Sequence, residues 1–194
     1  MHRTSIYFLL SLCSVFAFSH FSSLQAQGNL LPSIGLNSLP PDSTPICYAP
    51  IFTGNYTSSG LQPGDTAFDF TFYDLADNPH HLQSALNQGK PALLIAGSYT
   101  CPVFRNKISV INNVVAQYGS ALDVFVLYEL EAHPDIDTSV YFGYPNPGNA
   151  NLQAGILYRQ PTTYGERKAL AQDCVDSLPI SATVLIDGPC NEFY

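Results

Sequence analysis

The sequence has little charge, and very little of it is basic. Only 11% of its 194 residues are charged, with 7 Lys and Arg against 15 Asp and Glu. A protein that binds DNA or RNA needs clustered basic side chains to neutralise phosphates. This chain has no such cluster, and its formal net charge is −8. We therefore expect no nucleic-acid partner.

Long apolar runs are also lacking. The mostly apolar stretch at residues 6–18 is shorter than the ~20 residues that a membrane-spanning helix needs, so an uncleaved anchor is disfavoured. It follows the basic Arg3 and precedes small residues that end at Ala26, which is typical of a secretory signal peptide. We predict that residues 1–26 are a signal peptide and that the protein is exported to the periplasm or outside the cell. After cleavage we expect no contact with the membrane.

Cysteines are few, and none forms a Cys-x-x-Cys pair. One of the five, Cys13, lies in the predicted signal peptide. No Cys and His have the spacing of zinc ligands, so we expect no bound metal and no cofactor. Disulfides persist in an oxidising compartment. The four remaining cysteines allow three full pairings, among which the sequence does not choose; they are Cys47, Cys101, Cys174 and Cys190.

Composition divides the rest of the chain into an arm and a domain. Residues 27–63 are rich in Pro, Ser, Gly and Asn, and five prolines between positions 32 and 50 exclude a continuous helix there. We interpret this stretch as an extended arm or linker lying on the domain surface. The domain itself is expected at residues 64–194.

Apolar patterning in the domain predicts an α/β fold. Short apolar runs at residues 92–96, 123–128 and 183–186 are typical of buried strands. Residues 104–118 and 164–175 have helical spacing. An aromatic strand at 67–73 and a short helix at 81–88 precede them, and a long polar loop fills 135–160. Strands alternating with helices predict a largely parallel sheet.

The first candidate site follows the strand at 92–96. Cys101 stands before Pro102, a residue suited to the first position of a helix. The positive end of a helix stabilises a thiolate. Ser98 and Thr100 can add hydroxyl donors. The alternative is a buried structural cysteine without reactivity.

The second candidate site follows the next strand. Glu131 and His133 could donate a proton, pair with a thiolate or bind substrate. Because ligands bind beyond the carboxyl ends of parallel strands, both sites are expected at one edge of the sheet. The alternative is a solvated turn. Tyr141, Phe142 and Tyr144 could wall an apolar pocket, although ordinary packing also explains them.

These residues carry a resemblance to a known family. The segment Gly97–Phe104 (GSYTCPVF) resembles the active-site segment of the iodothyronine deiodinases, with Cys101 at the position of selenocysteine. Tyr128–Pro134 (YELEAHP) resembles the family's second motif, an acidic stretch that ends in Ala-His-Pro. The resemblance extends over about residues 65–175 and includes both motifs in order.

The resemblance implies a thioredoxin-like fold, with a central, mostly parallel sheet flanked by helices. It also implies reductive, thiol-dependent chemistry on a small molecule such as an aryl halide. Cys101 would be the nucleophile, and a thiol or thioredoxin-like reductant would regenerate it. Glu131 and His133 would assist substrate binding and proton delivery, and Ser98 and Thr100 would shape the pocket.

The sequence departs from the family in three places. Cysteine replaces selenocysteine, Tyr99 stands where the family has a cysteine, and Pro161 stands where it has a histidine. Two other hypotheses for the enzyme class therefore remain open, a peroxiredoxin-like peroxidase and a thiol-disulfide oxidoreductase. A non-catalytic thioredoxin-like binding module is the third alternative.

The end of the sequence also differs from the fold that the resemblance implies. Thioredoxin-like domains continue after the third strand with a hairpin and a last helix, whereas this sequence stops at Tyr194. We expect the domain to be incomplete at its C-terminal end, with an unpaired sheet edge.

Overall fold

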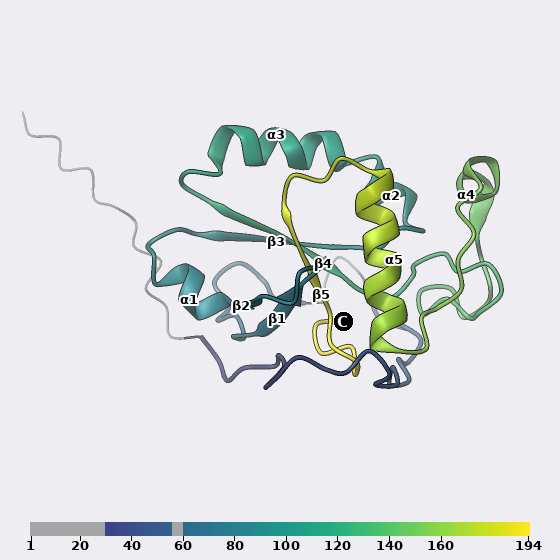
Figure 1. The fold of residues 1–194 in the computed structure, drawn as a ribbon, viewed down its shortest axis with the longest axis horizontal. Helices are drawn as coiled ribbons and strands as arrows, with labels where there is room; N and C mark the ends of the chain where they lie inside the picture. The colour runs from purple at the N-terminus through teal and green to yellow at the C-terminus, as the bar shows by residue number, and fades with distance from the viewer. Residues whose placement is uncertain (1–29, 56–59) are drawn as a thin grey trace, which may run out of the picture.

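The computed structural model describes residues 30–55 and 60–194, so the predicted signal peptide lies outside the described residues. Five strands form one sheet in the order β2-β1-β5-β4-β3 (Figure 1). Strands β3, β4 and β5 run parallel, and β1 and β2 extend the sheet as an antiparallel pair. The predicted α/β fold is confirmed. The strands are β1 Thr71–Asp74, β2 Pro79–His81, β3 Ala92–Gly97, β4 Asp123–Tyr128 and β5 Thr183–Ile186.

The helices match the sequence predictions in part. The periodic stretch at 104–118 forms two helices, because the turn closes on itself when Lys107 N–H donates to the Phe104 carbonyl three residues back (2.9 Å). The polar loop contains a short helix that its composition did not indicate. The helices are α1 Leu82–Leu86, α2 Pro102–Arg105, α3 Ile108–Tyr118, α4 Gly148–Ala154 and α5 Tyr164–Ser177.

Alternation along β4 divides the core into two layers. Val126 packs on the face covered by α3 and α5. Leu127 packs on the opposite face with α1 and residues of the arm (Figure 1). Both side chains are fully buried. This arrangement fixes the sheet between two apolar layers and leaves its carboxyl edge for polar groups.

The arm is attached along the domain by backbone hydrogen bonds. Leu36 N–H donates to the Thr71 carbonyl (2.7 Å), and Ile46 N–H donates to the Thr162 carbonyl (2.9 Å). A disulfide joins Cys47 to Cys190, 143 residues further on, which settles one pairing that the sequence left open. The arm is therefore fastened to the C-terminal segment rather than hanging free (Figure 1).

Strand β3 lies at the end of the sheet and pairs with β4 alone among the described residues. Leu93 on this strand is 37% exposed. In the described part of the chain, every helix is too short or too polar to span a membrane.

Candidate functional site

A cavity of about 500 Å³ opens at the carboxyl ends of β3 and β4. It contains residues from both motifs that the sequence analysis singled out, because the two parallel strands end side by side. Apart from one thiol, two hydroxyls, one imidazole and one carboxyl, the groups on its lining side chains are apolar. The lining residues are Ala96, Gly97, Ser98, Cys101, Val103, Glu129, Leu130, Ala132, His133, Tyr141 and Phe142.

Cys101 is a free, half-buried cysteine at the start of α2. Its sulfur accepts the backbone N–H of Phe104 at 3.5 Å, so one of the unpaired donors of the first helical turn is directed at the thiol. Gly97 lets the Phe104 ring pack against the end of β3, since a Cβ there would lie 2.4 Å from that ring. The α2 helix has only four residues, so the local N–H matters more here than a long helix dipole.

His133 is held by its Nδ1 atom, which lies 2.9 Å from the Asn146 carbonyl oxygen. A carbonyl oxygen can only accept, so Nδ1 carries the proton in this hydrogen bond. In the neutral ring, Nε2 is then free to accept a proton. The imidazole packs against Phe142 with ring centroids 5.1 Å apart. The geometry gives the cavity a positioned base.

The carboxylate of Glu131 connects the two motifs but faces the backbone. Its Oε2 accepts Thr100 N–H at 2.8 Å, and its Oε1 accepts the Tyr128 hydroxyl at 2.5 Å. Glu131 is fully buried. Burial raises the pKa of this carboxyl, and the hydrogen bonds from Thr100 and Tyr128 act in the opposite direction. Glu131 therefore holds the turn that carries Cys101, and its oxygens are already bonded.

Ser98 and Thr100 act in the same way as Glu131. Ser98 Oγ accepts Ala132 N–H at 3.1 Å, and Thr100 Oγ1 accepts His133 N–H at 3.0 Å. Among the described residues, the hydrogen bond to the Cys101 sulfur comes from Phe104 N–H and not from these hydroxyls. The pair aligns the turn after β3 with the turn after β4.

Two side chains from the long polar loop complete this framework and were missed by the sequence analysis as site residues. Gln160 bonds both backbone groups of Glu131, at 2.9 Å and 2.6 Å. Asn151, in α4, donates to the Thr100 carbonyl at 2.7 Å. Both contacts span many residues of sequence, so no local pattern reveals them.

Glu129 is the other residue that the sequence analysis gave no role. It lines the cavity directly after β4 and is buried. Burial, followed by the neighbouring Asp187 carboxyl, raises the pKa of Glu129 to about 8. An acidic residue immediately after a strand of buried apolar residues was the one available signal.

The other cysteines are placed differently from Cys101. Cys174 is fully buried in the core, and desolvation raises the pKa of its thiol to about 12. Cys47 and Cys190 are already joined. Tyr99, at the position where the deiodinase family has a cysteine, packs against Tyr158 with ring centroids 5.3 Å apart. No cluster of three His, Cys, Asp or Glu suited to a metal ion occurs in residues 30–55 and 60–194.

The fold and site thus define an α/β domain in which, among the described residues, Cys101 is the accessible thiol and lies in an aromatic-walled cavity. Comparison with known protein families finds no match. Human type II iodothyronine deiodinase is 26% identical over 132 residues, covering 66% of this chain and 45% of its own length. This chain therefore spans less than half of that relative. The crystal structure of a thiol:disulfide interchange protein, DsbE from Chlorobium tepidum, gives a TM-score of 0.40 at 17% identity, covering 66% of this chain and 64% of its own.

Proposed function

We propose that this protein is a thiol-dependent oxidoreductase in which the thiolate of Cys101 attacks a small molecule. The observation that carries the proposal is the shared cavity, in which the half-buried free thiol of Cys101 and the positioned imidazole of His133 occur together. A nucleophile beside a base is the arrangement that covalent catalysis requires. The similarity to a deiodinase supports the same assignment.

In the first half of the cycle, Nε2 of His133 takes the proton of the Cys101 thiol. The thiolate attacks atom X of a polarised bond X–Y, so that an S–X bond forms and X–Y breaks. The electron pair of X–Y leaves with Y, which then takes up a proton. The sulfur is oxidised by two electrons and the substrate is reduced by two.

In the second half, two external thiols restore the enzyme. One attacks the S–X adduct, the other completes a disulfide, and the products are the Cys101 thiol, H–X and the oxidised reductant. We propose an external reductant because, in residues 30–55 and 60–194, the other cysteines do not line the cavity, Cys174 is buried and the Cys47–Cys190 pair is already oxidised. A small thiol or a thioredoxin-like protein would serve.

Reductive dehalogenation of an aryl iodide is the reaction we favour. The similarity to a deiodinase supports it, and so do the aromatic side chains Tyr141 and Phe142 on the cavity wall. Peroxide reduction is the second candidate, favoured by the helix N–H directed at the sulfur. In the first reaction X is iodine, and in the second X is a peroxide oxygen.

We also propose that the protein is exported and works in an oxidising compartment. The disulfide between Cys47 and Cys190 supports this, since such bonds are rare where cellular thiols keep cysteines reduced.

The test compares the purified protein with its Cys101→Ser variant, with dithiothreitol as reductant and an aryl iodide or cumene hydroperoxide as substrate. We expect the serine variant to lose turnover, because a serine hydroxyl is hardly ionised at neutral pH. Cys174→Ser is the matched control and should keep it. Equal rates for Cys101→Ser and the parent would contradict the proposal and leave a binding module.

A further inference from the structure

Glu129 is a buried acid on the wall of the cavity without a partner of its own. It is 6% exposed, and its backbone N–H donates to the Gly97 carbonyl (3.2 Å). Its carboxyl, however, takes part in no hydrogen bond or ion pair with the described residues. Burying a carboxylate without a partner is strongly unfavourable, and such a group keeps its proton instead. Glu131, two residues away, shows the contrast, since both its oxygens accept hydrogen bonds.

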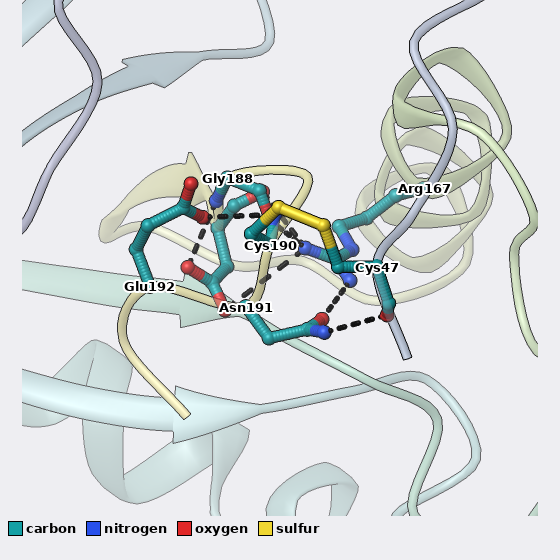
Figure 2. Close-up of a disulfide and its surroundings, with 7 residues drawn as sticks. Cys47, Arg167, Gly188, Cys190, Asn191 and Glu192 are labelled. Carbon is teal, nitrogen blue, oxygen red and sulfur yellow. Dashed lines mark hydrogen bonds and ion pairs between the residues drawn. A yellow bond between two sulfur atoms is a disulfide. The ribbon is translucent and has the colours of Figure 1, made fainter. Parts of the chain in front are cut away.

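The charges around Glu129 leave it uncompensated. Asp187, after β5, and Arg167, in α5, are both fully buried, and Arg167 Nη1 lies 3.9 Å from Asp187 Oδ2. The guanidinium donates to the Asp187 and Gly188 carbonyls and to the Asn191 side chain (Figure 2). One cation therefore serves two carboxyls, and its hydrogen bonds are directed to the segment after β5.

Asp187 and Glu129 consequently differ in protonation near neutral pH. Burial raises the pKa of Asp187 to about 6, with Arg167 acting against that rise. Burial and the Asp187 charge raise the pKa of Glu129 to about 8. The other ionisable groups that line the cavity with Glu129 are Cys101, His133 and Tyr141. The cavity thus holds a base with a free lone pair and an acid with a proton to give.

We propose that Glu129 is the acid of this site and donates its proton to the atom that leaves when Cys101 attacks. The inference rests on the proposed function and assigns the proton that its first half-cycle requires. Two carboxyl or imidazole groups whose surroundings separate their protonation states can divide the roles of acid and base. Here His133 takes the thiol proton and Glu129 supplies the other.

The step balances as follows in atoms and charge. The S–X bond forms, X–Y breaks with its electron pair on Y, the O–H bond of Glu129 breaks and Y–H forms. His133 is then an imidazolium and Glu129 a carboxylate, and one proton passed between them through solvent resets both. The substrates that gain most are those with strongly basic leaving groups, such as an alkoxide or an aryl carbanion.

The test uses Glu129→Gln, which keeps the shape of the side chain and removes the acidic proton. When the thiolate attacks cumene hydroperoxide or an aryl iodide, the leaving group is a strong base. The uncharged disulfide 4,4′-dithiodipyridine reacts with the same thiol but releases a stabilised thiopyridine that needs no acid. For whichever of these two substrates the parent turns over, we expect Glu129→Gln to lower the turnover rate by roughly 10²–10⁴-fold. Its reaction with the disulfide should match the parent's.

Glu166→Gln, at an exposed carboxylate of α5, is the matched control and should change neither rate. In the parent, turnover should fall as the pH rises through about 8, the pKa of Glu129, and the residual activity of Glu129→Gln should lack that fall. Infrared spectra should show a protonated-carboxyl band near neutral pH that is absent from Glu129→Gln.

Three results would overturn the acid role. These are undiminished turnover by Glu129→Gln, an equal loss with 4,4′-dithiodipyridine, and no protonated-carboxyl band in the parent near neutral pH. The last measurement needs no variant, so it decides even if Glu129→Gln does not fold. Failure of the proposed function looks different, because then Cys101→Ser and the parent would turn over substrate equally.

Discussion

Two strand ends at the same edge of the sheet each carry a cysteine, and their surroundings differ. Cys101 follows β3 as a free thiol that lines a cavity. Cys190 follows β5, which runs parallel to β3 and lies two strands away from it in the sheet. Cys190 is joined to Cys47 in the arm. Position at the carboxyl edge is therefore not enough to leave a cysteine as a free thiol.

The polar groups around each cysteine explain the difference. At the β3 end, Ser98, Thr100 and Glu131 bind backbone groups and leave the sulfur open. At the β5 end, Asn191 bridges the Arg167 guanidinium and the Cys47 carbonyl, at 2.5 Å and 3.0 Å (Figure 2). The β3 end leaves the Cys101 sulfur accessible, whereas the β5 end holds the Cys47–Cys190 disulfide. Substitutions should separate catalysis from stability accordingly.

The largest effect is expected at the β3 end, on turnover. His133→Ala removes the proposed base for the thiol proton and should lower kcat/KM by roughly 10²–10⁴-fold. Its free energy of unfolding should stay near that of the parent, because the imidazole is only half-buried and packs against Phe142, a partly exposed side chain. His81→Ala, at an exposed histidine on β2, is the control. Steady-state kinetics and urea unfolding measure both, and a variant that lost stability but not turnover would contradict the assignment.

The next effect is expected at the β5 end, on stability. Arg167→Met leaves Asp187 buried without its cation and removes three hydrogen bonds. Removing one member of a buried ion pair destabilises by about 3–5 kcal/mol. The exposed Arg159 gives the control, since Arg159→Met should change the free energy of unfolding by less than about 1 kcal/mol. Equal midpoints in urea for the two variants would refute the prediction.

Removing the disulfide should have a somewhat smaller effect. The double variant Cys47→Ala/Cys190→Ala should lose about 2–4 kcal/mol of unfolding free energy, as is usual when a long loop is opened. Its Cys101 should react with 4,4′-dithiodipyridine at the parental rate, because the arm's joint lies at the other strand end. Parent protein reduced with dithiothreitol provides the comparison. A large fall in Cys101 reactivity would show that the two ends are coupled.

A change of stability with pH links the two ends through Glu129 and Asp187. The pKa values of both carboxyls are raised in the fold, to about 8 and about 6, so the folded protein holds protons that the unfolded chain releases. Stability is then fully present at low pH and is lost as pH rises through these values. We expect the unfolding free energy to fall from about pH 5 to about pH 8, by about 1.4 kcal/mol per unit for each proton. Urea unfolding of Glu129→Gln should show a smaller fall between about pH 6 and 8 than the parent shows, and a parental slope there would refute the assignment.

Local pattern was enough to predict the elements whose burial it determines. Strand β4 is apolar on both faces and was predicted with the bounds Asp123–Tyr128 that the structure has. The proximity of Cys101 and His133 also followed from sequence, because parallel neighbours end at one edge. By contrast, the break between α2 and α3 depends on a single backbone turn near Lys107, which the apolar spacing does not register.

Contacts between distant segments were beyond reach of such reasoning. The choice of Cys47 and Cys190 as partners depends on where the arm runs, which prolines alone do not determine. The state of Glu129 depends on Arg167 and Asp187, which lie on other elements. Burial and charge pairing of this kind arise only when the chain is folded.

The joint between Cys47 and Cys190 turns most of the domain into a covalent ring. If the two chain ends are pulled apart, the load passes through the sulfur atoms, and the polypeptide between them carries none. The polypeptide enclosed by the disulfide, with a separation of 143 residues, would extend to roughly 470–510 Å. An unfoldase that threads a protein from one end would meet two linked polypeptide segments at this point. It would need a reductant to break the disulfide before the loop could pass. In a single-molecule stretching record, that length should be released only after reduction.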